Sequence, residues 1–154
     1  PNLVSGIIEN IKKPGFNAGC LKLEITESAL MQNAQRSIDM LNQLKDLSIK
    51  VCVDDFGTGY SSLSYLHTFP IDTLKIDRSF VHDMSRNYRN MEIIRTIIML
   101  AHNLKLDVIA EGVETAEQYA QLSALGCQFA QGFYFSRPVD KNDATRLIHE
   151  DSQW

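Results

Sequence analysis

Acidic side chains recur along this chain at positions that favour metal chemistry. Asp54 and Asp55 are adjacent and follow the apolar run 51–53, while Glu24 and Glu111 each lie in a further short run of apolar residues. Carboxylates gathered in one place repel one another and are costly to bury unless cations neutralise them. Because the donors are all oxygens, Mg²⁺ or Mn²⁺ suits them better than zinc. Two such ions can clamp the attacking and leaving oxygens of a phosphodiester.

A lysine stands in the middle of another apolar run. Lys75 lies between Leu74 and Ile76, and a lysine buried there needs a carboxylate partner. Two interpretations stay open at this point. The ammonium group either orients the attacking water or helps to deprotonate it, or it forms an ion pair that only supports the structure.

The glycine-containing segment 57–62 follows the aspartate pair directly. Its sequence, Gly-Thr-Gly-Tyr-Ser-Ser, lacks the third glycine of a dinucleotide-binding fingerprint and is not followed by the lysine of a P-loop. We interpret it instead as a mobile lid loop, whose glycines permit tight turns beside the metal site. The turn would also allow Asp54 and Asp55, which point to opposite faces of an ideal strand, to reach the same metal.

Five short segments with strand-like composition would carry these groups. Amphipathic stretches at 3–12, 35–47 and 90–104, a capped helix beginning after Thr115 and a last helix after Asp140 fill the intervals. The alternation of strands and helices predicts a parallel sheet with helices outside it. Each strand is apolar at its start and polar at its end, which is where parallel α/β folds place their active sites. The predicted strands are Leu21–Ile25, Val51–Asp55, Thr73–Asp77, Asp107–Glu111 and Phe129–Phe135.

The composition excludes several classes of protein. The chain has 154 residues and a formal net charge of −4, which argues against binding to a DNA or RNA duplex through a basic patch. No apolar run approaches the length of a membrane span. Cys20, Cys52 and Cys127 form no close pair and flank or lie within apolar runs, so we expect reduced, buried thiols and a cytoplasmic protein.

Five blocks of this sequence together resemble the EAL-domain family of cyclic di-GMP phosphodiesterases, which are bacterial second-messenger signalling enzymes. The ten-residue block Asp-Asp-Phe-Gly-Thr-Gly-Tyr-Ser-Ser-Leu at 54–63 is the most specific of them. The resemblance implies an α/β fold, a partial (β/α)₈ TIM barrel of EAL type with about five parallel strands and flanking helices. It also implies hydrolysis of cyclic di-GMP to linear pGpG with Mg²⁺ or Mn²⁺ in a two-metal site. The blocks are 24–28, 54–63, 75–77, 110–114 and 131–133.

The same resemblance implies a role for individual residues. Glu24 and Asp54 look like ligands of the first metal, and Asp54, Asp55 and Glu111 like ligands of the second. Lys75, Glu111 and Asp54 would be the catalytic residues, with Lys75 in contact with the catalytic water.

Three further positions have implied roles outside the metal sites. Glu27 looks like the glutamate that anchors the loop at 56–63. Glu114 and Gln131 would belong to the substrate side and outer shell of the site.

The sequence departs from the family pattern at its N-terminal end. The Glu-Ala-Leu motif and the asparagine ligand on the following strand do not occur in it. We therefore expect residues 1–154 to be the C-terminal part of a single EAL domain whose N-terminal strands are missing, since such a barrel typically needs about 250 residues. The fragment alone would then be nearly inactive.

Further expectations follow from that division of the barrel. The exposed sheet edges predict a homodimer or domain-swapped self-association. The resemblance to the family implies a further dimer contact in the segment 78–95 of the full domain. An upstream sensory or GGDEF-type domain and a membrane anchor remain open. So do two other functions: a catalytically inactive EAL module that senses cyclic di-GMP or binds a protein, and an enolase-type barrel enzyme.

Overall fold

The structure, a computed structural model, describes residues 3–11, 17–59 and 63–149. A single five-stranded sheet forms its centre, with the strands in the order β1-β2-β3-β4-β5 and every neighbouring pair parallel. This confirms the predicted fold class, because parallel neighbours require a crossover between each strand and the next. The strands are β1 (Lys22–Thr26), β2 (Lys50–Phe56), β3 (Thr73–Ile76), β4 (Asp107–Glu111) and β5 (Phe129–Gln131).

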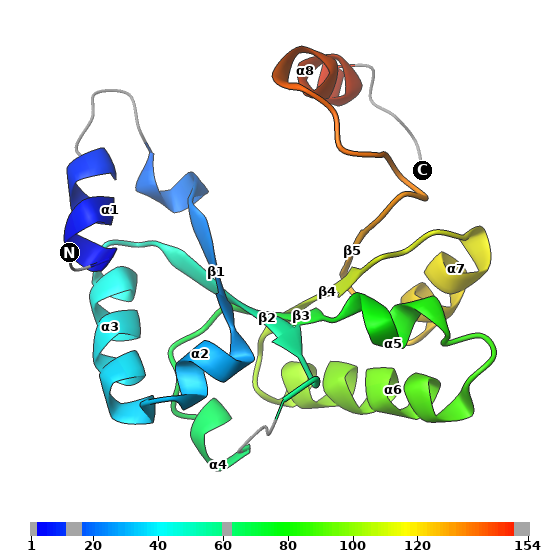
Figure 1. The fold of residues 1–154 in the computed structure, drawn as a ribbon, viewed down its shortest axis with the longest axis horizontal. Coiled ribbons are helices and arrows are strands. Elements are labelled where there is room, and N and C mark those ends of the chain that lie inside the picture. The colour runs from blue at the N-terminus through cyan, green and yellow to red at the C-terminus, as the bar shows by residue number, and fades with distance from the viewer. Residues whose placement is uncertain (1–2, 12–16, 60–62, 150–154) are drawn as a thin grey trace.

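Helices supply the crossovers and cover the outer face of the sheet (Figure 1). α1 and α3 lie beside β1 and β2, and α5, α6 and α7 lie beside β3 to β5, whereas α8 stands apart from the sheet (Figure 1). No helix in the described ranges is long and apolar enough to cross a membrane. The helices are α1 (Leu3–Ile11), the 3₁₀ turn η1 (Ala18–Cys20), α2 (Glu27–Met31), α3 (Ala34–Asp46), α4 (Leu63–Leu66), α5 (Arg78–His82), α6 (Tyr88–Asn103), α7 (Ala116–Ala124) and α8 (Lys141–His149).

The core lies between the sheet and its outer helices. Val53 of β2 and Leu74 of β3 are fully buried, and so are Leu44 of α3 and Ile98 of α6. Successive strand side chains alternate between the two faces of the sheet, so Val51 and Val53 of β2, like Val108 and Ala110 of β4, point outward to the helices. The other face carries the charged residues together with Cys52 and Ile109. Burial of each large aliphatic side chain stabilises the arrangement by about 1.5–3 kcal/mol.

Helix boundaries agree closely with the caps predicted from the sequence. Thr115 and Gln118 form the expected capping box at the start of α7, and the carboxylate of Asp140 accepts from the backbone N–H groups of Asn142 and Asp143 at the start of α8. Both caps satisfy backbone donors that a helix start leaves without intrahelical partners.

Two expectations about the elements are wrong. β5 ends at Gln131 instead of continuing to Phe135, because the chain turns at Gly132 and Phe135 donates its backbone N–H to the Gly132 carbonyl. Cys20 is exposed in η1 instead of buried, although Cys52 is fully buried. β1 begins at Lys22, one residue later than predicted, because Leu21 forms the C-cap of this turn.

Two predictions fall partly on residues outside the described ranges. These are the last residue of the amphipathic stretch predicted at 3–12 and the lid loop predicted at 57–62, of which only Gly57–Gly59 is described.

Candidate metal centre

Lys75 lies at the centre of a group of carboxylates on the inner face of the sheet. Its Nζ is 2.9 Å from Oε2 of Glu24, 3.1 Å from Oδ1 of Asp54 and 2.5 Å from Oε1 of Glu111. The four residues come from β1, β2, β3 and β4, and their side chains meet near the carboxyl ends of these strands. An ammonium group has three donors, and all three have a carboxylate partner here.

The electrostatic environment of Lys75 keeps its side chain charged. Only 5% of the Lys75 side chain is exposed, against 50% for Glu24, 23% for Asp54 and 20% for Glu111. Burial alone would lower the pKa of Lys75, but the hydrogen bonds to Glu111, Glu24 and Asp54 outweigh it, so the pKa is raised above the ordinary value. A group held protonated in this way is a donor and a fixed positive charge rather than a ready proton acceptor.

The second aspartate reaches the site through an unusual backbone conformation. Asp55 has φ = 54°, in the left-handed region, and the β2–β3 register shifts between Val53 and Phe56. This irregularity turns Asp55 to the same side as Asp54, so the rotation occurs at Asp55 itself and not in the turn that follows. Carboxylate oxygens of Asp54, Asp55 and Glu111 consequently lie within 4.8 Å of one another.

This donor set fits a hard divalent cation. Three carboxylate oxygens within a few ångströms of one another match the oxygen-only coordination that Mg²⁺, Mn²⁺ and Ca²⁺ prefer. Partial burial and the neighbouring carboxylates of Asp54 and Asp77 raise the pKa of Asp55. Burial is the largest cause of this rise in pKa, and a bound cation would relieve the part that comes from the neighbouring negative charges.

Asp77 borders the same cluster and also caps a helix. Its carboxylate accepts from the backbone N–H of Ser79 at 2.9 Å and from the Ser79 hydroxyl. Burial opposes the charged form of Asp77, but the hydrogen bonds from Ser79 prevail and lower its pKa. The sequence placed Asp77 at the polar end of a predicted strand, whereas β3 ends at Ile76 and Asp77 caps α5; the proximity to Asp55 comes from the folded β2–β3 pair.

Glu27 joins the start of α2 to the turn after β2. Its side chain is buried, and Oε2 accepts from the backbone N–H of Gly57 at 3.0 Å. A buried carboxylate that accepts a backbone N–H holds that segment strongly, because charge-assisted hydrogen bonds are about twice as strong as neutral ones. The contact fixes the first residues after the aspartate pair.

The remaining two predicted residues lie beside this cluster rather than in it. Gln131 stands opposite Glu111 in the β4–β5 register. Glu114 is exposed and lines a neighbouring pocket together with Arg78, His82 and Asp83 of the segment after β3. The sequence analysis did not single out these last three residues; the i, i+4 spacing of Arg78 and His82 was the only signal that they share one face of a helix.

Comparisons with known proteins place this chain in a family. Residues 1–138 match the EAL domain family, and the chain is 46% identical over 138 residues to the cyclic di-GMP phosphodiesterase NbdA of Pseudomonas aeruginosa. That alignment covers 90% of this chain and 18% of NbdA. The chain belongs to the EAL domain family, as its sequence motifs predicted.

Solved structures agree with this assignment. The PaMucR phosphodiesterase in complex with c-di-GMP superimposes with a TM-score of 0.90 and 38% identity, over 92% of this chain and 57% of that one. Klebsiella pneumoniae BlrP1 in complex with manganese and cyclic di-GMP has a TM-score of 0.81 and 32% identity, over 90% of this chain and 35% of that one. This chain therefore spans 57% of the solved PaMucR chain, 35% of the BlrP1 chain and 18% of NbdA.

Proposed function

We propose that this chain carries the metal-binding half of a cyclic di-GMP phosphodiesterase that forms linear pGpG. The observation that carries the proposal is the convergence of Asp54, Asp55 and Glu111 beside the buried Lys75. The substrate is suggested by relatives that act on or bind cyclic di-GMP. A structural ion pair alone would need one carboxylate for Lys75, whereas the site gathers three around it.

Each of these residues would have a distinct task. Asp54, Asp55 and Glu111 would hold a divalent cation, and Glu24 with Asp54 would contribute to a second one. When bound, Mg²⁺ or Mn²⁺ would activate the attacking water and stabilise the charge on the phosphodiester oxygens. Manganese in the BlrP1 complex supports this choice of metal.

Lys75 would act as a fixed donor in the reaction. Its raised pKa keeps the ammonium charged, so it can stabilise negative charge that develops on the phosphate. It can donate a hydrogen bond to the attacking water once one of its three carboxylate partners binds metal instead. Glu27 would act indirectly, as a positioning residue, because its carboxylate holds Gly57 at the start of the loop beside the site.

We further propose that the chain is the C-terminal part of a longer EAL domain. It spans 57% of the PaMucR chain, and within the described residues β1 and β5 each pair with one neighbouring strand only. Such edges favour pairing with another strand. Without the rest of the barrel, we expect the 154-residue chain to self-associate and to hydrolyse cyclic di-GMP little or not at all.

The test compares the 154-residue chain with a longer chain that includes the upstream strands. Cyclic di-GMP hydrolysis is followed by chromatography of pGpG, in Mn²⁺, in Mg²⁺ and in chelator. The longer chain should be active only with metal, and Asp55→Asn should abolish activity while the exposed control Asp46→Asn leaves it unchanged. Equal activity of the two chains would refute the proposal that the active site is incomplete without the upstream strands. A longer chain that binds cyclic di-GMP without hydrolysing it would favour the sensor function.

A further inference from the structure

Gln118, near the start of α7, is buried although its side chain is polar. Its Oε1 accepts from the backbone N–H groups of Glu114 at 2.8 Å and Thr115 at 3.0 Å. Its Nε2 donates to the backbone carbonyl groups of Val81 at 3.1 Å and His82 at 3.4 Å. A side-chain amide has two donors and one oxygen with two lone pairs, so both of its polar atoms are satisfied. Fully satisfied buried polar groups rigidify the segments that they join.

The two segments that Gln118 joins begin at the candidate metal centre. Only Asp77 separates α5 from β3, the strand that carries Lys75, and Glu111 is the last residue of β4. Residues 112–115 follow Glu111 directly and lead into α7. A displacement of either segment would therefore reach the group of carboxylates within a few residues.

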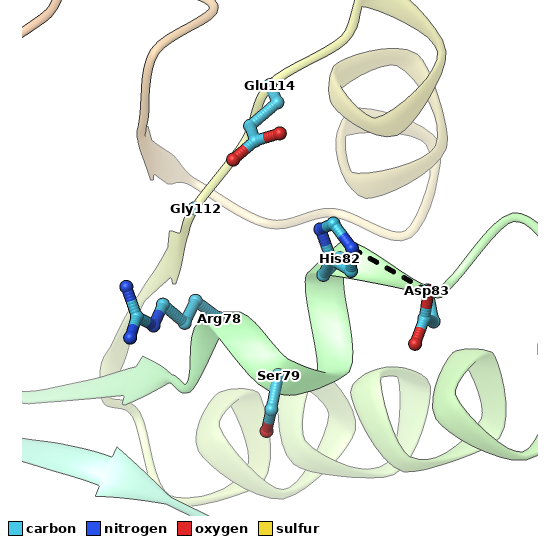
Figure 2. Close-up of a pocket in the computed structure, with 6 residues that line it drawn as sticks. All are labelled: Arg78, Ser79, His82, Asp83, Gly112 and Glu114. Carbon is cyan, nitrogen blue, oxygen red and sulfur yellow. Dashed lines mark ion pairs between the residues drawn. The ribbon is translucent and has the colours of Figure 1, made fainter.

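These two segments approach each other closely at Gly112. Figure 2 shows α5 on one side and the segment that carries Gly112 on the other. Gly112 has φ = 70°, and a Cβ atom there would lie 2.7 Å from Cβ of Arg78. On its other side the same segment is bonded to β5, because the backbone N–H of Val113 donates to the Gln131 carbonyl at 3.1 Å. The segment after β4 is thus held between β5 and α5, and Gln118 supplies hydrogen bonds on the α5 side.

Glu111 is the metal-site carboxylate whose position depends on this support. Asp54 and Asp55 are adjacent on β2, whereas Glu111 comes from β4, and β3 lies between these two strands. The Glu111 carboxylate must reach past Lys75 to come within 4.8 Å of the aspartate oxygens. Ligands of a metal site have to be held within about 0.5 Å of the productive geometry by the residues around them.

We propose that Gln118 is a positioning residue for the metal site, which keeps Glu111 in place for coordination by tying the segment after β4 to α5. The inference rests on the proposed function and extends it from the ligands to a residue outside the ligand set. A residue that only stabilised the fold would raise the melting temperature and have no effect on the metal affinity of the folded protein.

The experiment measures Mn²⁺ binding by calorimetry, on the 154-residue chain and on the chain extended upstream. Gln118→Met keeps the length of the side chain, adds no charge and removes its hydrogen bonds. It should weaken Mn²⁺ binding about tenfold, as is typical when support outside the ligand set is lost. The measurement is made at a temperature at which circular dichroism shows each variant to be folded.

Two further variants separate positioning from stability. Thr115→Val removes the hydroxyl that caps the backbone N–H of Gln118 and leaves the Gln118 amide in place, so it should lower Tm without changing the Mn²⁺ affinity. Gln118→Glu keeps acceptor oxygens for the α7 start, but in its ionised form the new carboxylate cannot donate to α5. Its added negative charge would by itself strengthen cation binding, so weaker Mn²⁺ binding to this variant must come from geometry. This variant decides the question if Gln118→Met does not fold.

The outcomes separate this inference from the proposed function. If the wild type binds Mn²⁺ and the folded Gln118→Met variant binds it as tightly, the positioning role is wrong and the proposed function stands. If Thr115→Val loses as much affinity as Gln118→Met, the loss follows from destabilisation of α7 and the positioning role is again wrong. If neither wild-type chain binds Mn²⁺, the metal site and the positioning role both fail.

Discussion

Replacing Lys75 by methionine isolates the charge at the centre of the carboxylate cluster, because methionine retains most of the apolar stem. Removing one partner of a fully buried ion pair costs about 3–5 kcal/mol, whereas an exposed pair contributes about 0–1 kcal/mol. Lys75 is buried but its partners are 20–50% exposed, which places the expected loss at about 2 kcal/mol. For a domain of this size, that loss lowers Tm by about 4–8 °C in chelator.

The sign of the metal effect gives the sharper test. Lys75→Met leaves Glu24, Asp54 and Glu111 without their shared cation, so Mn²⁺ should bind more tightly to the variant and stabilise it more than the wild type. Each tenfold gain in affinity adds about 1.4 kcal/mol once metal is in excess. Thermal unfolding followed by circular dichroism, in chelator and in excess Mn²⁺, measures both effects.

A control and a contrary result complete this experiment. The exposed Lys45→Met on α3 should change stability by less than about 0.5 kcal/mol in either buffer. If Lys75→Met were as stable as the wild type in chelator, or if Mn²⁺ widened the difference in Tm, the cluster could not be a site where lysine and metal neutralise the same carboxylates.

Other substitutions test the frame around the site. Gly132→Ala places a Cβ 2.1 Å from the backbone carbonyl oxygen of Val113 and should lower the stability measured by thermal unfolding by about 2 kcal/mol or more. The control Gly6→Ala has open space around it and should be neutral or slightly stabilising. Equal melting temperatures of the two variants would contradict the close packing at Gly132. Gln118→Leu removes its hydrogen bonds to two segments and should lower stability by about 2 kcal/mol in urea unfolding, so an unchanged midpoint would show that it does not join them. Cys20 is exposed and should react first with a thiol reagent near pH 8. Burial raises the pKa of Cys127 to about 11, so its labelling should be slow at pH 8 and its rate should keep rising with pH up to about 11. Equally fast labelling of Cys20 and Cys127 at pH 8 would refute this.

Much of the fold followed from hydrophobic patterning. Asp107–Glu111 is a strand with the predicted bounds, and α6 begins two residues before the predicted helix. Long apolar stripes and caps are local signals, so the sequence alone reveals them. The convergence of the polar strand ends was also predictable, because parallel strands align their carboxyl ends at one edge of the sheet.

Features that depend on tertiary contacts were not predictable in the same way. The short helix α5 has only five residues and too little periodicity to be recognised. The early end of β5 depends on the close approach of Gly132 to Val113, a residue far from it in sequence. The pocket beside Arg78 depends on how α5 meets the segment after β4, which no local pattern records.

The left-handed conformation of Asp55 sets stability and chemistry against each other at one position. A residue with a Cβ is strained there by about 1–2 kcal/mol, though less for aspartate than for most, and glycine would remove both that strain and one of the crowded negative charges. Selection of variants for heat resistance alone should therefore accept Asp55→Gly and return well-folded proteins that no longer hold the second aspartate. In such a library, a variant that is changed at position 55 and melts at a higher temperature is expected to have lost activity.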